Sequence, residues 1–214
     1  MHIEIISDVV CPWCFIGKRR LERALATWPA DPVEIGWRPF ALNPDMPAGG
    51  MDRAAYLETK FGGAEKAAAI YERVRQIGLE ENIVFAFERI NHTPNTLDAH
   101  RLIHYAAAQD AQDAVVEGIF AAYFLDGRDL SRNETLAEIA ADAGLDQAET
   151  LSWLASNADA EVTLEEIAMA QRMGVSGVPC FVFERKYALS GAQEPAAFHK
   201  MFEVLRNEAE AADA

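Results

Sequence analysis

The sequence has few cysteines, few basic residues and no long apolar run, and each shortage excludes a class of protein. Three cysteines in 214 residues are too few for a disulfide framework, so a cysteine pair is expected to be catalytic or metal-binding. Lys and Arg number 19 against 34 Asp and Glu, a formal net charge of −15. Nucleic acids and anionic membranes bind clustered cations. We therefore expect neither as a partner.

The N-terminal segment gives an expectation about location. A transmembrane helix needs about 18 consecutive apolar residues, and the sequence has no such run. A secretory leader needs a basic start, an apolar stretch and a small-residue cleavage site. Residues 1–8 show none of these and lead directly to Cys11 and Cys14. We expect a cytoplasmic protein.

The first forty residues predict a strand, a helix and a second strand. Residues 3–6 form a short β-branched run typical of a buried strand. Residues 11–28 repeat apolar side chains at helical spacing, and residues 33–38 alternate apolar and polar ones. The two cysteines therefore lie where the first strand passes into the helix.

The rest of the chain predicts a helical insertion and a second mixed segment. Residues 39–50 hold three prolines and two glycines and indicate a linker, and residues 51–173 are almost wholly helical in pattern. Three helix starts carry capping signals, at Asn95, Ser131 and Thr163.

The segment 83–87 is an apolar break whose state the pattern leaves open. Gly174 is expected to cap a helix. A strand over 180–183, a hairpin partner over 186–189 and a helix from Pro195 that frays towards its end complete the pattern.

These elements predict an α/β fold of two parts. The order strand–helix–strand, helical block, strand–strand–helix lets the two ends form one sheet with helices packed against it. We expect a discontinuous thioredoxin-like domain formed by 1–45 and 160–214, with a helical insertion domain formed by 46–159.

The spacing Cys-Pro-Trp-Cys over residues 11–14 indicates thiol–disulfide exchange. This chemistry needs a thiolate that attacks and a second thiol that resolves the mixed disulfide. Cys11, at a helix N-terminus, is stabilised as an anion and is the expected nucleophile, while Cys14 lies one turn on as the resolving thiol. Pro12 suits the first helical turn, and Trp13 offers an apolar surface beside the attacking sulfur.

A zinc half-site is the alternative use of the pair. Structural zinc usually takes four ligands, and only Cys180 and scattered histidines remain to complete them. We expect no metal.

Several longer motifs resemble the DsbA-like thioredoxin superfamily, in particular its FrnE and 2-hydroxychromene-2-carboxylate isomerase branch. They are Ser-Asp-Val-Val-Cys-Pro-Trp-Cys (7–14), Gly-Lys-Arg-Arg-Leu (17–21), Trp-Arg-Pro-Phe-Ala-Leu-Asn-Pro (37–44), Asn-Thr-Leu-Asp-Ala-His-Arg-Leu (95–102), Gly-Val-Ser-Gly-Val-Pro (174–179) and Ser-Gly-Ala-Gln (190–193). The resemblance covers nearly the whole chain and implies the same discontinuous fold.

The resemblance also implies roles for particular residues. Pro179 matches the cis-proline that faces the cysteine pair, and Val178 would offer its backbone to a bound thiol substrate. Asn95 and His100 would lie on the part of the insertion that faces the cleft and contact the substrate. Cys180 departs from the branch, which commonly has Thr there. It is either a small buried residue or a third thiol near the pair.

Three functions follow from these residues. The first is a thiol–disulfide oxidoreductase that acts on a protein or on a glutathione-like small thiol or disulfide. The second is a glutathione-dependent isomerase or transferase of the 2-hydroxychromene-2-carboxylate isomerase or kappa-class type, whose kappa-class relatives carry Ser where Cys11 stands. The third, a redox-inert binding module, leaves both thiols without a role. The intact pair favours redox chemistry, with no tightly bound cofactor, glutathione as a possible co-substrate, and a monomer or homodimer.

Overall fold

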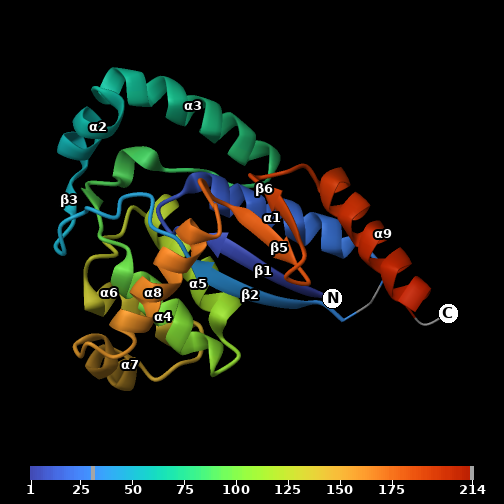
Figure 1. The fold of residues 1–214 in the computed structure, drawn as a ribbon. Coiled ribbons are helices and arrows are strands. Elements are labelled where there is room, and N and C mark those ends of the chain that lie inside the picture. Colours follow the sequence, from blue (N-terminus) through green and yellow to red (C-terminus); the bar gives the residue numbers. More distant parts are fainter. Residues whose placement is uncertain (30–31, 213–214) are drawn as a thin grey trace.

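A four-stranded mixed sheet lies at the centre of the computed structural model, which describes residues 1–29 and 32–212 (Figure 1). Its strand order is β2–β1–β5–β6, with β1 parallel to β2 and the other neighbours antiparallel. The four strands are β1 (His2–Ser7), β2 (Glu34–Pro39), β5 (Cys180–Phe183) and β6 (Tyr187–Ser190). The predicted opening and closing segments are therefore confirmed as parts of one sheet.

Helix α1 (Pro12–Ala26) connects the two parallel strands, and α9 (Pro195–Ala212) packs beside it. Ile3 and Ile5 of β1 and Phe181 and Phe183 of β5 are almost wholly buried. The Phe181 ring meets Phe198 of α9 edge-on at a centroid distance of 4.9 Å. This apolar layer fixes α9 on the sheet beside the helix that carries the cysteines.

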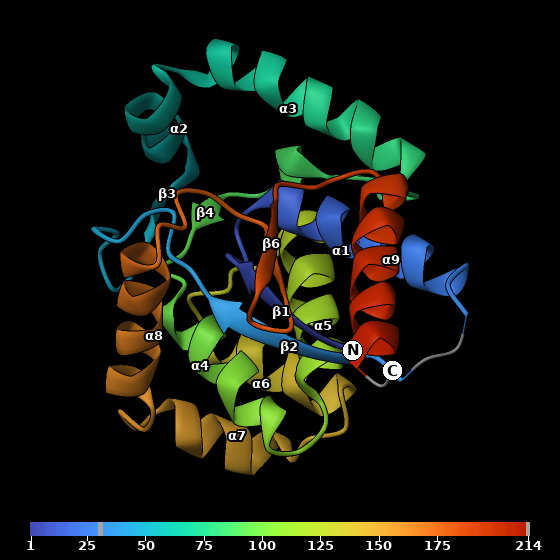
Figure 2. The same cartoon turned by 45° about the vertical axis from the view of Figure 1, so that its right-hand side comes forward.

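The helices between β2 and β5 form two groups (Figures 1 and 2). In the first, α4, α5 and α8 contact β2, while α6 and α7 pack beneath them. The second group, α2 and α3, arches over the other side of the molecule. The bounds are α2 (Arg53–Phe61), α3 (Ala64–Glu80), α4 (Leu97–Ala107), α5 (Gln112–Phe124), α6 (Asn133–Asp142), α7 (Gln147–Leu154) and α8 (Ala160–Arg172), with a short ribbon of β3 (Met51–Asp52) and β4 (His92–Thr93) and a 3-10 turn, Phe87–Arg89.

Gly174 lies just beyond the end of α8 and helps to cap it, as predicted. Its φ is +84°, a conformation that glycine adopts readily. The Gly174 and Val175 amides donate to carbonyls of the last turn of α8. The chain can therefore leave the helix and turn towards Cys180.

Three local predictions were wrong. Thr163 lies inside α8, where its hydroxyl donates back to Asp159 O, and α6 has Arg132 at its N-cap instead of Ser131. The tail does not fray at residues 207–212, because α9 runs to Ala212 and Glu208 binds Lys186 and Tyr187.

Residues 83–86 have no regular secondary structure, and Phe87 begins the 3-10 turn. Ile83, Phe85 and Phe87 are buried, and Ala86 N donates to Phe124 O at 2.8 Å.

Among the described residues, no helix is long and apolar enough to cross a membrane.

Candidate active site

The cysteine pair occupies the junction between β1 and α1. Cys11 is the N-cap residue of α1 with extended φ and ψ of −94° and 110°, and Pro12 occupies the first turn. The Cys11 amide donates to Asp8 O at 3.0 Å, and the Cys14 amide donates to Cys11 O at 3.0 Å. The Cys11 sulfur therefore lies at the positive end of the helix dipole, which favours an anion.

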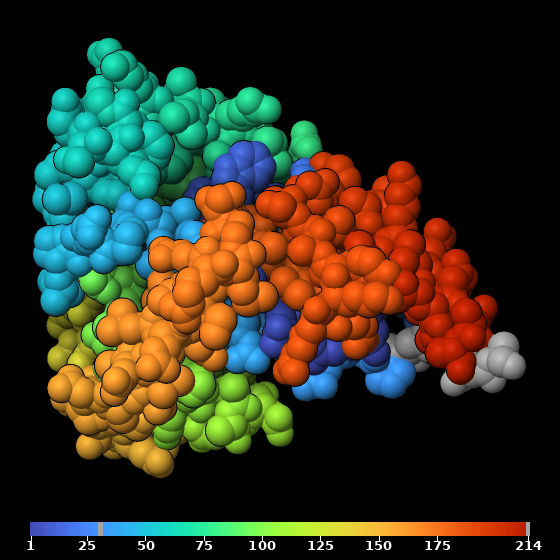
Figure 3. All heavy atoms as spheres, viewed as in Figure 1, coloured from blue at the N-terminus to red at the C-terminus, as the bar shows by residue number. Residues whose placement is uncertain are grey.

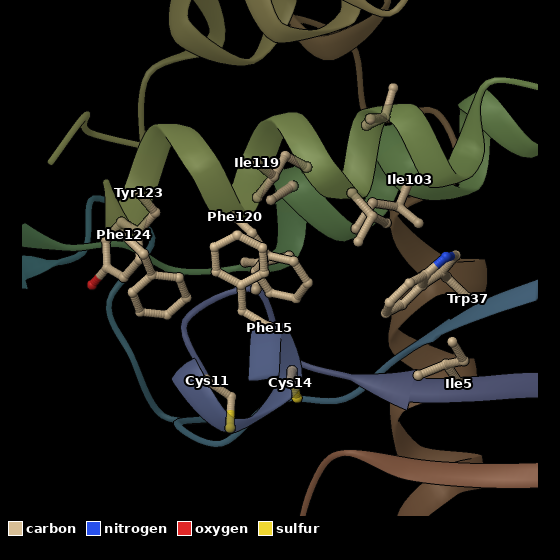
Figure 4. Packing of buried hydrophobic residues seen from close by; sticks show 14 of the residues in the cluster. Ile5, Cys11, Cys14, Phe15, Trp37, Ile103, Ile119, Phe120, Tyr123 and Phe124 are labelled. Atoms are coloured by element: carbon tan, nitrogen blue, oxygen red, sulfur yellow. The ribbon is translucent and has the colours of Figure 1, made fainter. Parts of the chain in front are cut away.

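Cys11 and Cys14 are both free thiols, and both are buried. Cys11 is 4% exposed and Cys14 is 0% exposed. In Figure 4 both sulfur atoms point away from the rings of Phe15 and Phe120. Burial, the hydrogen bond with Cys11 and the charge of Cys11 together raise the pKa of Cys14 well above its ordinary value. Cys14 is therefore held as a neutral thiol while Cys11 is unmodified.

The loop before β5 meets the sulfur of Cys11. The Val178–Pro179 peptide bond is cis, and Cys11 Sγ lies 3.6 Å from Val178 O in a weak hydrogen bond. Gly17 of α1 permits this approach, because a Cβ there would lie 2.9 Å from Pro179 Cγ. Gly191 N donates to Pro179 O at 2.7 Å, which ties the loop to the segment that follows β6. Val178 is half-buried and thus faces both the thiol and the surface.

Asp8 is buried, and it organises the turn that leads to Cys11. Its two carboxylate oxygens accept hydrogen bonds from Val10 N and Leu42 N, the latter at 2.7 Å. The carboxylate therefore joins the segment before the cysteines to the segment that follows β2.

His100 and Asn95, two of the expected substrate contacts, bind backbone groups in this structure. His100 is 3% exposed, with Nε2 3.0 Å from Phe40 O and 3.6 Å from Asp8 Oδ1. Asn95 Oδ1 accepts from Leu97 N, and its Nδ2 donates to Met46 O at 2.8 Å. Both side chains thus hold the loops around the site, whereas Trp13 beside the cysteines is partly exposed.

Cys180 lies in a small apolar cluster separate from the one that contains the pair. It packs with Ile6, Phe40 and Ala170, whereas Cys11 and Cys14 belong to the main core. Burial raises the pKa of the Cys180 thiol. These surroundings match the expectation of a small buried residue better than that of a third reacting thiol.

The α2–α3 hairpin brings three further side chains towards the segment that follows β2. Arg53, Tyr56 and Tyr71 come from α2 and α3, and Asn43 contacts Tyr56 OH at 3.4 Å. No local sequence pattern marks these side chains as site residues, because α2 and α3 are far from Cys11 in the sequence. In the described part of the chain, no cluster of three His, Cys, Asp or Glu side chains is arranged to hold a metal ion.

The sheet topology, the helix-capping cysteine and the cis-proline loop define a thioredoxin-like fold with a helical insertion. The profile of the DSBA-like thioredoxin domain matches residues 2–203, so the chain belongs to that family. The chain is 34% identical to a probable DsbA oxidoreductase of Streptomyces coelicolor, SCO1869, over 94% of this chain and 88% of that one, with a TM-score of 0.85. It is 26% identical to the uncharacterised protein YwbO of Bacillus subtilis (strain 168), over 85% of this chain and 86% of the relative.

Two more distant structures share the fold. A 2-hydroxychromene-2-carboxylate isomerase is 18% identical with a TM-score of 0.69, covering 100% of this chain and 98% of that one. The cytosolic disulfide reductase DsbM of Pseudomonas aeruginosa, solved with GSH, is 18% identical with a TM-score of 0.65, covering 97% and 100%. The predicted resemblance to the DsbA-like superfamily is confirmed.

Proposed function

We propose that this protein is a thiol–disulfide oxidoreductase that cycles Cys11 and Cys14 between dithiol and disulfide. The observation that carries the proposal is the geometry at Cys11. Its sulfur lies at the N-terminus of α1 and contacts the Val178 carbonyl of the cis-proline loop, with Cys14 buried one turn further along. Nucleophile, resolving thiol and substrate-binding backbone thus meet at one point.

In the reducing direction, the Cys11 thiolate attacks one sulfur of a substrate disulfide. A bond forms between Cys11 and that sulfur, and the second substrate sulfur leaves as a thiolate that takes a proton. Cys14 then loses its proton and attacks Cys11 Sγ, which releases the first substrate sulfur as a thiolate. The substrate has gained two electrons, and the protein holds a Cys11–Cys14 disulfide.

The surroundings of Cys14 give these steps an order. Burial, the Cys11 hydrogen bond and the Cys11 charge raise the pKa of Cys14 in the dithiol form. Once Cys11 is bonded to substrate sulfur, its hydrogen bond and its charge are gone, so the pKa of Cys14 falls. Cys14 is therefore protonated before the first step and a better nucleophile in the mixed disulfide.

The reduction potential tests the proposal. The protein is equilibrated with glutathione buffers, and the Cys11 and Cys14 redox states are determined by thiol labelling and mass spectrometry. We expect a reversible two-electron transition that Cys14→Ser abolishes and Cys180→Ser leaves in place. No transition in the wild-type protein would refute the proposal.

A trapping experiment assigns the two roles. With a disulfide substrate, Cys14→Ser should accumulate a mixed disulfide on Cys11, whereas Cys11→Ser should accumulate none. In the wild-type protein, release of the substrate thiol should become faster with rising pH, by roughly tenfold per pH unit while Cys14 stays mostly protonated. A mixed disulfide on Cys14 in the Cys11→Ser protein would reverse the assignment.

We further propose that the protein works in the cytoplasm as a reductase or isomerase with glutathione as a co-substrate. The fold shared with cytosolic DsbM, solved with GSH, supports this direction. A glutathione-dependent isomerase or transferase is the second candidate, supported by the fold shared with 2-hydroxychromene-2-carboxylate isomerase. Glutathione binding without any two-electron transition would favour this second function.

A further inference from the structure

Arg53, at the start of α2, is a cation held between two tyrosines. Its guanidinium lies 5.3 Å from the Tyr56 ring centroid and 5.2 Å from that of Tyr71. Nη1 donates to Thr93 Oγ1 at 3.1 Å and Nη2 to Tyr71 OH at 2.7 Å. Among the described residues, no carboxylate pairs with Arg53. The result is an oriented positive charge whose hydrogen bonds go only to hydroxyl groups.

This lack of a counter-ion separates Arg53 from other partly or fully buried arginines of the chain. Arg19, Arg20 and Arg38 each bind a carboxylate. The protein has 34 acidic residues, so carboxylates are abundant. A half-buried guanidinium without one is suited to an anion supplied by a ligand, because its planar fork matches a carboxylate.

A short chain of contacts connects Arg53 to the cysteine turn. Cys11 N donates to Asp8 O, and Leu42 N donates to the Asp8 carboxylate. The next residue, Asn43, donates through Nδ2 to Tyr56 OH at 3.4 Å. Tyr56 packs against Arg53, so four consecutive contacts lead from the nucleophile to the cation.

Electrostatic coupling supports the same proximity. Burial raises the pKa of Tyr56, the Asn43 hydrogen bond and the Arg53 charge oppose this, and the charges of Asp8 and Cys11 add to it. Burial also raises the pKa of Tyr71, with the Arg53 charge opposing that rise and the Cys11 charge adding to it. In Figure 3 the surface is hollowed between the teal atoms of α2 and α3 and the blue atoms of the N-terminal segment.

The hydroxyl of Tyr123 lies close to the same cation. Tyr123 is 1% exposed. Burial raises the pKa of Tyr123, and the Arg53 charge opposes that rise. Lys60 adds a second cation nearby, because its Nζ donates to Asn43 Oδ1 at 3.0 Å.

We propose that Arg53, with the hydroxyls of Tyr56 and Tyr71, binds a carboxylate of the substrate and selects small anionic thiols and disulfides. The proposal rests on the function proposed above and names its substrate class. Arg53 would bind the carboxylate while the substrate sulfur meets Cys11 Sγ beside the Val178 carbonyl. The carboxylate of Asp8 is engaged by two backbone amides. The negative charge that pairs with Arg53 would therefore come from the ligand.

The test compares two disulfides that differ only in charge, dithiodipropionate and its diamide. Each is mixed with the reduced full-length protein, and oxidation of Cys11 and Cys14 is followed by quenching and thiol labelling. An acidic protein repels a dianion, so without a local cation the diamide should react faster. We expect the dicarboxylate to react faster instead. If neither disulfide oxidises the pair, the function proposed above fails, and if both oxidise it with the diamide faster, only the carboxylate site fails.

Two variants with the same change in net charge sharpen the comparison. Arg53→Gln should lower the dicarboxylate-to-diamide rate ratio by about tenfold, the loss expected for a charge-assisted hydrogen bond. Arg132→Gln removes an exposed arginine at the N-cap of α6 and should leave the ratio unchanged. Equal ratios in wild type and Arg53→Gln would overturn the proposal.

Salt dependence gives a test that needs no variant, should Arg53→Gln fail to fold. Added salt screens the interaction between a guanidinium and a carboxylate at a partly exposed site. We expect the wild-type ratio to fall steadily as potassium chloride is raised. A ratio that rises with salt would show net repulsion of the dianion and would overturn the proposal.

Discussion

The two groups of inserted helices differ in how they are held. In α4, α5 and α6 the inward side chains are almost wholly buried, and seven residues of α5 are buried, among them Phe120, Tyr123 and Phe124. Helix α2 buries no residue, and α3 buries Ala67, Val74 and Gly78. The first group therefore forms a rigid support for the sheet, and the second is a hairpin that buries few residues.

The attachments of the hairpin explain what it can do. At its far end, Glu81 lies next to the last residue of α3 and pairs with Arg20 and Arg23 of α1. At its near end, Tyr56 packs against Arg53 and contacts Asn43, the residue after Leu42, whose amide binds Asp8. A segment with few buried contacts opens at lower free energy than a packed core. The hairpin is therefore the more adaptable of the two groups, and it carries the residues that we propose bind substrate.

The largest expected effect lies in the packed group. Phe120 is 0% exposed and stacks on Phe15 at a centroid distance of 5.1 Å. Phe120→Ala should lower the free energy of unfolding by about 3–5 kcal/mol, because it removes apolar contacts and leaves a cavity. Urea unfolding monitored by circular dichroism measures this, and a loss below about 1 kcal/mol would contradict the rigid-support interpretation.

The next effect lies at the anchor of the hairpin. The Glu81 side chain is 1% exposed and accepts from Arg20 Nε at 2.8 Å. Glu81→Gln removes the buried carboxylate shared by Arg20 and Arg23 and leaves Arg20 with only the exposed Glu194 as its ionic partner, so it should cost up to about 3 kcal/mol. Glu88→Gln is the matched control, because Glu88 pairs with Arg75 at the surface, and it should cost under about 1 kcal/mol. Equal losses would remove the distinction between the two pairs.

A smaller, pH-dependent effect is expected where α1 meets α5. Burial acts to raise the pKa of Glu117, but the hydrogen bond and charge of Arg19 and the charge of Lys18 lower it overall. This contribution is present above the unfolded-state pKa of Glu and is lost as the pH falls through the lower folded-state value. Glu117→Gln should therefore cost up to about 1 kcal/mol near neutral pH, after allowance for partial exposure. Unfolding curves of both proteins should converge in acid, and a constant difference would exclude the ionic contribution.

The smallest effect on stability is expected inside the hairpin. Phe61, at the end of α2, is half-buried and meets Tyr71 edge-on at 5.9 Å. Phe61→Ala should cost about 1 kcal/mol or less by urea unfolding, because the ring keeps much of its exposure. Hydrogen exchange should meanwhile speed up in α2 more than in α5. Equal acceleration in both helices would show that the two groups unfold together.

Local chemistry made the position of the cysteine pair predictable. Pro12 and the helical spacing after Cys11 place the two thiols one turn apart at a helix start, and this requires no knowledge of distant segments. The same holds for Gly174, whose positive φ only glycine adopts readily. Thr163 shows the limit of such reasoning, because its cap-like spacing falls inside α8.

The burial of individual side chains could not be read from local patterns. His100 was expected in the cleft, yet it lies buried against Phe40 O and Asp8. No local sequence pattern marked Arg53, Tyr56 and Tyr71 as site residues, because α2 and α3 are separated from Cys11 in the sequence by β2 and the linker.

The sequence by itself determined the order of elements and the cysteine pair at the start of a helix, because spacing and capping act over a few residues. Only the tertiary structure decided that Cys180 packs in a different cluster from the pair and that Arg53 binds hydroxyl groups and, among the described residues, no carboxylate. Burial and charge pairing depend on which distant segments meet, and such contacts between segments leave no mark in a local pattern.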